Sequence, residues 1–297
     1  MLFTILINSQ KNEYMLVLTS PTFTISMQQS GKAVTTDEWA MYNDKIHQIT
    51  KEFTICHWDK LQYFTDNINT LWSYCYVHDE NSTLFCLEMD YSLIPSKANR
   101  HTILNAWIGK SVMSGEIVPF NHRKWNHACW TYSTASGYSR IYYNGEILVS
   151  IQMIPDENVT VLEGFKDATD AAFVIGQQQD KVRGGYNTNQ LYIGEIGELN
   201  MWDHVLNIDD VIELSKCKHI SKGNIVSWDL QKWKVNGAKI NKISRHNSFC
   251  GNTKTLVIFP QHQPLHMSKS LCSIHGGKIV TPTSQKENEQ VIVKGTF

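Results

Sequence analysis

The sequence carries almost no net charge and contains no long apolar run. Its formal net charge at pH 7 is −1, from 27 Lys and Arg against 28 Asp and Glu. No field of one sign would attract nucleic acid or an anionic membrane, so we exclude both as partners. The apolar runs are much shorter than the roughly 20 residues that span a bilayer, so the sequence predicts no membrane span in this chain. G-x-S-x-G, P-loop and H-E-x-x-H motifs are also missing, which removes common hydrolase and nucleotide-binding signatures.

The composition is that of a folded, core-forming chain. Apolar residues make up 42% and charged residues 19% of the 297 residues, which argues against disorder and allows one large domain or two small ones. Residues 1–34 lack a clear period, although the stretch from Leu16 to Leu18 suits a strand. The opening is apolar for only seven residues, which is short for a signal peptide. We therefore expect this end to be a fragment or an imperfect gene model.

The cysteines are widely spaced. There are seven, and none forms a C-x-x-C pair or a metal-ligand cluster with histidine. Asn81 and Asn158 begin Asn-x-Ser/Thr sequons. Together these features favour an oxidising, extracellular compartment, in a secreted protein or a cell-surface ectodomain. The alternative is a cytosolic protein with buried free thiols.

From about Thr50 onward the sequence reads as short strands separated by turns. Residues 52–58 alternate polar and apolar side chains, and residues 71–77 and 83–87 flank a polar turn. Asn144-Gly145 predicts a tight type I′ hairpin turn between two strands. Strands at this spacing indicate an all-β sandwich or barrel.

One helix is expected after residue 206. Asn207 can cap it, two aspartates follow in its first turn, and Cys217 ends it. Ile208, Val211 and Ile212 share one face, which we expect to pack on the sandwich.

Several motifs resemble the pentraxin family. The run from Gly176 to Leu206 is closely similar, above all in Gly194-Glu-Ile-Gly and Asn200-Met-Trp-Asp. The stretches that carry Cys56 and Cys129 also resemble the family's two cysteine strands. The resemblance implies a two-sheet jelly-roll sandwich with one short helix packed on it, a pentraxin-like domain over residues 35–250. The tail, residues 251–297, loosely resembles the start of a C-type-lectin-like module.

The resemblance also implies disulfides. Cys56 and Cys129 match the family's own pair, and Cys217 and Cys250 match an extra pair of long pentraxins and pentraxin-like receptor ectodomains. Cys75 and Cys86 lie symmetrically about a turn, so they form either a cross-strand disulfide or two buried thiols. Cys272 is left over.

Members of this family bind calcium, and the resemblance places the ligands. Calcium takes oxygen donors, chiefly carboxylates and carbonyls. The matched positions all carry oxygen donors: Glu80, Asn81, Gln178, Gln179, Asp180, Asn187 and Gln190. A glycan on Asn81 and calcium ligation by Asn81 exclude each other.

The charge of this ligand set is low. Gln178 and Asn187 carry amides where the family carries carboxylates, which leaves Glu80 and Asp180 as charged ligands. Because affinity follows ligand charge, we expect one weakly held calcium ion at most, or none. Lys181 and Arg183 lie in the same loop and could instead neutralise Asp180 or bind an anion without metal.

Three functions remain in competition. The first is a recognition domain for a glycan, a phospholipid head group or a protein ligand. The second is a structural or homo-oligomerisation module of a larger adhesion-type ectodomain. The third is a sugar-cleaving enzyme, which we disfavour because the spacing of Glu195 and Glu198 on a strand puts their side chains on opposite faces. We therefore predict that the chain is not an enzyme.

Overall fold

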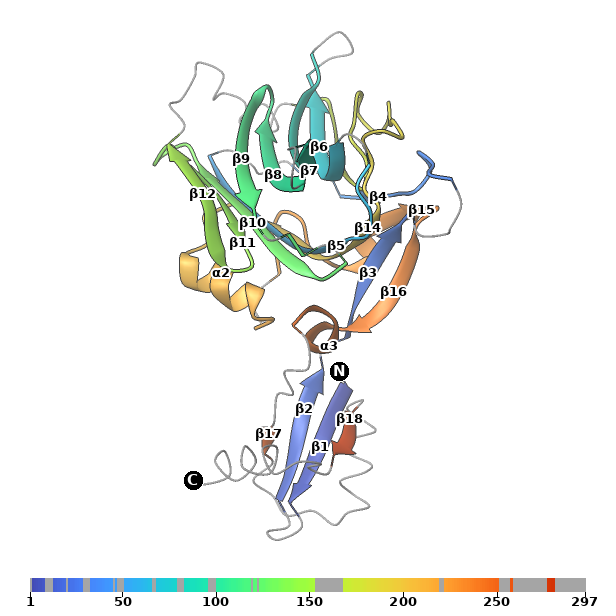
Figure 1. Cartoon of the computed structure of the whole chain (residues 1–297), viewed down its shortest axis with the longest axis vertical. Coiled ribbons are helices and arrows are strands. Elements are labelled where there is room, and N and C mark those ends of the chain that lie inside the picture. The colour runs from blue at the N-terminus through green and yellow to red at the C-terminus, as the bar shows by residue number, and fades with distance from the viewer. Residues whose placement is uncertain are drawn as a thin grey trace. The chain divides into compact units, whose positions relative to one another are not determined.

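In a computed structural model, the chain forms two compact units. One comprises residues 24–241, and the other comprises residues 1–23 together with 242–297 (Figure 1). The structure describes residues 2–8, 13–19, 21–28, 33–44, 46, 51–65, 68–78, 83–95, 100–118, 120–121, 123–152, 168–218, 222–250, 257–258 and 277–280. Asn158, Cys272, Glu80 and Asn81 lie outside these residues.

The larger unit is a sandwich of two antiparallel sheets with seven strands each. The first sheet has the order β12-β11-β10-β5-β14-β3-β16. Its strands are β3 (Pro21–Met27), β5 (Glu52–Leu61), β10 (Asn126–Ser133), β11 (Tyr138–Tyr143), β12 (Glu146–Gln152), β14 (Gly194–Trp202) and β16 (Lys239–Ser244). The second sheet has the order β15-β4-β13-β6-β7-β8-β9. Its strands are β4 (Trp39–Tyr42), β6 (Ile68–Val77), β7 (Phe85–Pro95), β8 (Arg100–Ile108), β9 (Ser111–Ile117), β13 (Asp170–Ile175) and β15 (Trp233–Asn236). The predicted all-β jelly-roll sandwich is confirmed.

An aromatic core joins the two sheets. Trp72 and Phe173 of the second sheet stack at 5.5 Å between ring centroids, and Trp72 lies 6.1 Å from Trp130 of the first. Phe53 meets Trp130 edge-on at 4.9 Å. These side chains are at most 1% exposed, and burial of such rings is the largest apolar contribution that single residues make to a fold.

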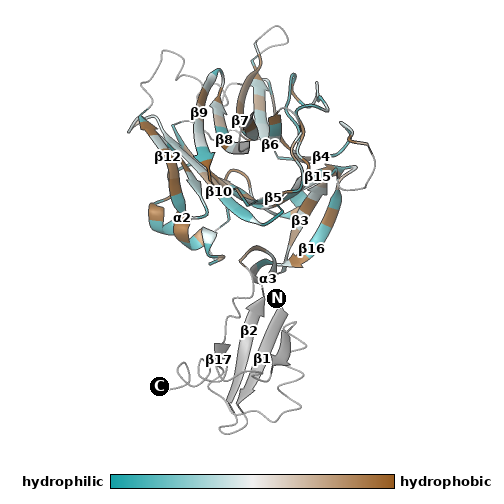
Figure 2. Cartoon of the chain, in the orientation of Figure 1, coloured by the Kyte–Doolittle hydropathy of each residue, from teal (hydrophilic) through white to brown (hydrophobic). Residues whose placement is uncertain are grey.

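The locally signalled elements form as predicted. Asn144 and Gly145 both adopt positive φ angles, 52° and 87°, between β11 and β12, as a type I′ turn requires. Helix α2 (Ile208–Ser215) is capped by Asn207, whose Oδ1 accepts from the Asp210 amide at 2.8 Å. Bands of polar and apolar residues alternate along α2 and β3 (Figure 2).

The helix buries part of the predicted face: Val211 is buried as predicted and Ile212 is half-buried, whereas Ile208 departs from the prediction. Ile208 is 44% exposed, whereas Val211 and Leu214 are buried. The helix packs on the Cys56–Cys129 disulfide, which joins β5 to β10. Ile208 is the first residue of the helix and is not part of this cluster, so the expectation for Ile208 was wrong. The short 3₁₀ helix η2 (Leu230–Lys232) precedes β15.

The smaller unit combines both ends of the chain. Strand β1 (Leu2–Asn8) pairs antiparallel with β2 (Glu13–Thr19) and parallel with β18 (Gly277–Val280), and β17 (Val257–Ile258) pairs with β2. Helix α3 (Arg245–Phe249) belongs to the same unit. Strands in the tail were not expected from its sequence, because their partners lie more than two hundred residues away. No described helix is long and apolar enough to cross a membrane.

A polar cluster lies inside the sandwich. Asp59 is completely buried and accepts hydrogen bonds from the hydroxyls of Tyr91 at 3.0 Å and Tyr192 at 3.2 Å. Burial raises the pKa of Asp59 to about 7 and lowers the pKa of His57 to about 3. Between about pH 4 and 6.5 the folded state therefore holds one proton on Asp59, whereas the unfolded state holds one on His57.

These opposite shifts predict a specific pH dependence. In the wild type the two groups cancel between about pH 4 and 6.5, because each state binds one proton there. In Asp59→Asn only the depressed pKa of His57 remains, and stability that is present above pH 6.5 is lost as the pH falls. The stability difference between wild type and variant should therefore grow by about 1.4 kcal/mol per pH unit on acidification. Urea unfolding at pH 4.5, 5.5 and 6.5 measures this, and a difference independent of pH would contradict it.

Candidate functional site

The predicted ligand loop follows β13 and lies against the outer face of the second sheet. It begins at Gly176, whose φ is 87° and where a Cβ would approach the Met27 sulfur to 2.1 Å, so only glycine fits. The Gly176 amide donates to the Leu71 carbonyl at 2.9 Å. The chain therefore leaves the sheet at a fixed point.

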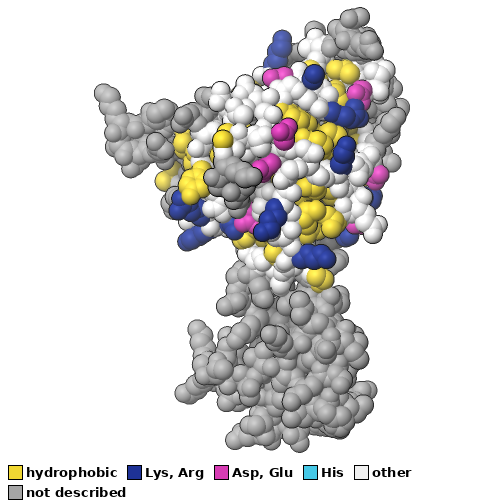
Figure 3. All heavy atoms as spheres, turned by 90° about the vertical axis from the view of Figure 1, so that its right-hand side faces the viewer, with side chains coloured by type: hydrophobic (Ala, Val, Ile, Leu, Met, Phe, Trp, Pro, Cys, Tyr) yellow, Lys and Arg dark blue, Asp and Glu magenta, His cyan; other side chains and the backbone are white. Residues whose placement is uncertain are grey.

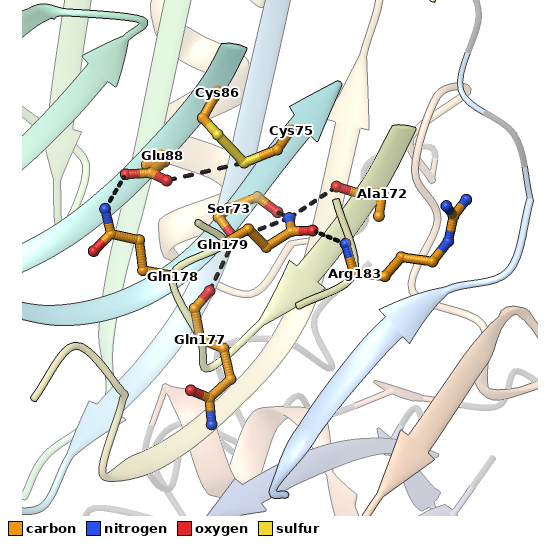
Figure 4. Close-up of a disulfide and its surroundings, with 9 residues drawn as sticks. All are labelled: Ser73, Cys75, Cys86, Glu88, Ala172, Gln177, Gln178, Gln179 and Arg183. Atoms are coloured by element: carbon orange, nitrogen blue, oxygen red, sulfur yellow. Dashed lines mark hydrogen bonds between the residues drawn. A yellow bond between two sulfur atoms is a disulfide. The ribbon is translucent and has the colours of Figure 1, made fainter. Parts of the chain in front are cut away.

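Gln179 holds this loop in place. Its side chain is 2% exposed, and its Nε2 donates to Ser73 O, Ser73 Oγ and Ala172 O at 3.0–3.1 Å. Its Oε1 accepts from the Arg183 amide at 2.8 Å (Figure 4). The Ser73 hydroxyl in turn donates to the Gln177 carbonyl at 2.8 Å. Both polar atoms of the Gln179 side chain are occupied, so this residue could give a metal only its main-chain carbonyl.

The residues between these anchors face outward. Gln177 and Gln179 are buried, whereas Gln178 is half-buried and Asp180 is exposed. This alternation puts the side chains of Gln178 and Asp180 on the opposite side of the loop segment from the two buried amides. The structure thus presents two predicted ligands together.

Glu88 lies beside Gln178, a position that the sequence analysis did not predict. It lies on β7 opposite Ser73 of β6 and Trp107 of β8. Gln178 Nε2 is 3.5 Å from Glu88 Oε2, and Gln178 Oε1 is buried and has no hydrogen-bond partner among the described residues. Burial, then the charges of Asp90 and Asp180, raise the pKa of Glu88 to about 7. A negative charge at Glu88 is therefore unfavourable unless a cation accompanies it.

Asp90, the next residue on this face of β7, is fully engaged. Its Oδ1 accepts from Asn105 Nδ2 at 2.8 Å and its Oδ2 from Trp107 Nε1 at 2.6 Å. Ser114 Oγ donates to Asn105 Oδ1 at 2.7 Å. Burial raises the pKa of Asp90 to about 6, against the effect of the two hydrogen bonds. Asp90 is a structural anchor for β8 and β9.

The basic residues of the loop do not pair as one alternative supposed. Arg183 forms an ion pair with Asp170 at the start of β13 and donates to the Ala171 carbonyl at 2.8 Å. It is therefore committed away from Asp180. Lys181 bonds Gly184 through main-chain atoms, at 3.2 and 2.9 Å, which closes a turn. On the face shown in Figure 3, basic and acidic side chains of the described residues are interspersed.

The remaining predicted ligands lie farther along the loop or outside the described residues. Asn187 is exposed, and its Oδ1 accepts from the Asn189 amide at 3.0 Å. Gln190 is half-buried at the end of that turn. Glu80 and Asn81, the first two of the predicted ligands in the sequence, lie outside the described residues.

The second disulfide borders this site. Cys75 and Cys86 lie opposite each other on β6 and β7, with a Cα–Cα distance of 4.1 Å, and are bonded. Of the two alternatives for these cysteines, the structure has the disulfide. Cys217 and Cys250 are disulfide-bonded as well. The described groups of metal-ligand type, Cys56–His127–Cys129 and Cys75–Cys86–Glu88, each use sulfurs of a disulfide, which offer no thiolate to a metal.

Comparison with known proteins gives a consistent result. A family model described as the Pentaxin family matches residues 32–242. C-reactive protein 1.4 of Limulus polyphemus is 30% identical over 183 residues, which are 60% of this chain and 69% of that protein. Neuronal pentraxin-2 of Mus musculus is 31% identical over 105 residues, 35% of this chain but 23% of that protein. The structure of native heptameric SAP-like pentraxin from Limulus polyphemus matches with a TM-score of 0.58 at 20% identity, over 77% of this chain and 97% of that one.

The anchoring role of Gln179 predicts a large effect of its removal. Gln179→Leu leaves the carbonyls of Ser73 and Ala172 and the Arg183 amide without their partner, and should lower the free energy of unfolding by about 3 kcal/mol. Gln178→Leu is the matched control, because it removes a single long hydrogen bond. Urea unfolding compares the two, and trypsin cleavage after Lys181 reports the freed loop. Equal destabilisation by both substitutions would contradict the anchor.

Proposed function

Because this chain belongs to the pentraxin family, we propose that it is an extracellular recognition domain for a glycan, a phosphate-bearing head group or a protein ligand. The supporting observation is the position of Gln178 and Asp180, which the loop presents beside Glu88. The Oε1 atom of Gln178 accepts no hydrogen bond from the described residues, so this oxygen can serve as a metal ligand. Such an arrangement suits binding through a cation better than binding through the protein alone.

The residues fit one calcium ion. Asp180 supplies a charged oxygen, Gln178 an amide oxygen and Gln179 a main-chain carbonyl, and Asn187 and Gln190 lie farther along the same loop. Glu80 and Asn81, which fall in the sequence between β6 and β7, would complete the set. This donor set is all oxygen, which is what calcium prefers.

The chain's own part in recognition is to hold these oxygens still. Gln179 fixes the loop to β6, and the Arg183–Asp170 ion pair fixes its return. A bound calcium ion would supply positive charge to which phosphate or sugar oxygens can bind. Because Gln179 and Arg183 already hold the loop, we expect little conformational entropy to be lost on ligand binding.

Recognition is favoured over catalysis by the state of Glu195. Its carboxylate forms an ion pair with Lys60, and its Oε2 accepts from Thr24 Oγ1 at 3.2 Å. A β-bulge separates it from Glu198, whose φ is 52°. Both carboxylate oxygens of Glu195 are thus engaged within the protein, which opposes a role in catalysis on a substrate.

Calcium should raise the thermal stability of the protein. A ligand that binds only the folded state adds about 2.7 kcal/mol at a hundredfold excess over Kd. We expect a higher unfolding temperature in millimolar calcium than in chelator, and we expect Asp180→Asn to abolish most of this shift. Asp209→Asn, an exposed charge on α2, is the control and should retain it. A wild type that is indifferent to calcium would count against the calcium part of the proposal, and binding to glycan and head-group arrays without calcium would then be the remaining test.

Self-association is a second candidate function. Strand β12 is an edge of its sheet, and its Ile147 is 48% exposed. An exposed apolar residue on an edge strand is a ready contact for another copy of the chain.

This candidate predicts a concentration-dependent mass. Multi-angle light scattering at micromolar concentration should find an oligomer, and Ile147→Asp should shift it toward the monomer of 34.1 kDa. Ile208→Asp, which removes an exposed apolar side chain on helix α2 and not on an edge strand, serves as a control for general solubility. A monomeric wild type would remove this candidate.

A further inference from the structure

We propose that Glu88 of β7 is itself a ligand of the calcium ion and supplies the charge that Gln178 lacks. This inference rests on the proposed calcium-dependent function and names a residue outside the loop that the sequence predicted. It changes the described charged ligands from Asp180 alone to Asp180 and Glu88.

Side-chain alternation along β7 places Glu88 on the face of the sheet that carries the loop. Leu87 and Met89 are fully buried between the sheets, so Glu88 points to the outer face, as alternation along a strand requires. Glu88 pairs with Ser73 across the ladder, and the Ser73 carbonyl accepts from Gln179. Ser73 therefore contacts the loop through Gln179 and also pairs with Glu88 across the ladder, which places Glu88 next to the loop.

The contact between Glu88 and Gln178 brings two candidate ligands together. The distance from Gln178 Nε2 to Glu88 Oε2 is 3.5 Å (Figure 4), which is the long limit of a hydrogen bond. Calcium ligands lie about 2.3 to 2.6 Å from the ion, so oxygens in one shell are roughly 3 Å apart. A rotation of the Gln178 amide would place its unpartnered Oε1 and the Glu88 carboxylate within one such shell.

Glu88 differs from Asp90 in its lack of donors. Both oxygens of Asp90 accept short hydrogen bonds. Among the described residues, Glu88 accepts only the long bond from Gln178, and its Oε1 lies 4.0 Å from the disulfide sulfur of Cys75. A half-buried carboxylate with so little compensation is poised to bind a cation.

The surrounding charges favour the same conclusion. Asp90 and Asp180 both act on Glu88 as like charges, and the ion pair of Arg183 is with Asp170. A divalent cation beside Glu88 and Asp180 would remove this repulsion. The competing arrangement is a protonated Glu88 that donates a hydrogen bond to Gln178 Oε1 and has no part in calcium binding.

An exchange of charge between the two positions separates these arrangements. Calcium affinity is measured by isothermal titration calorimetry for wild type, Glu88→Gln, the double variant Glu88→Gln/Gln178→Glu and the control Asp209→Asn. Affinity depends on the number of charged ligands, so Glu88→Gln should weaken binding by about tenfold or more. The double variant returns one carboxylate to the same place and should recover most of the loss. The control should match the wild type.

A second readout guards against a folding defect. In chelator, Glu88→Gln should unfold at the same temperature as the wild type or higher, since a like charge has been removed. In calcium the order should reverse.

The outcomes are distinct. Equal calcium affinity of wild type and Glu88→Gln, or a double variant as weak as the single one, would overturn the role of Glu88 and leave the proposed function standing. A wild type that binds no calcium would overturn both the role of Glu88 and the calcium part of the proposed function.

Discussion

The buried amide of Gln179 is the constraint on which the site depends. Four hydrogen bonds tie this one side chain to β6, to β13 and back to its own loop. An amide is suited to this place because it both donates and accepts, so it satisfies carbonyls and an N–H at once. With residues 177 and 179 turned inward, residues 178 and 180 must turn outward. The outward position of the Gln178 and Asp180 side chains thus follows from the packing of the Gln177 and Gln179 side chains, which face inward.

On the outer face of the second sheet, one carboxylate is fully hydrogen-bonded and another is not. Asp90, Asn105, Trp107 and Ser114 form a closed hydrogen-bond chain across β7, β8 and β9. Such a network holds its strands in register, and each member has its partners. Glu88 is one pleat away from Asp90 on the same strand, yet it lacks equivalent donors among the described residues. A fully hydrogen-bonded network therefore lies beside a carboxylate that the described residues leave incompletely compensated.

Sequence reasoning was most accurate where the signal is local. The Asn144-Gly145 turn and the Asn207 cap are decided within a few residues, and both formed as predicted. The hairpin that carries Cys75 and Cys86 was recognised, but only its register showed that the sulfurs meet. The pairing of Arg183 with Asp170, the exposure of Ile208 and the tail strands depend on partners brought together by the fold. No periodicity or motif in one segment reports such contacts.

Glu88 shows why the charge of a site cannot be counted from its motif. The loop from Gln178 to Gln190 contains a single matched carboxylate, and on that count alone a weak site is expected. Glu88 and Gln178 are ninety residues apart in the chain but in contact in the fold. Since the electrostatic energy depends on distance in space, a carboxylate from the neighbouring strand contributes as much as one in the loop. If Glu88 is a ligand as proposed, we expect the affinity of the calcium site to depend on the sheet face as a whole, with β7 compensating for amides in the loop.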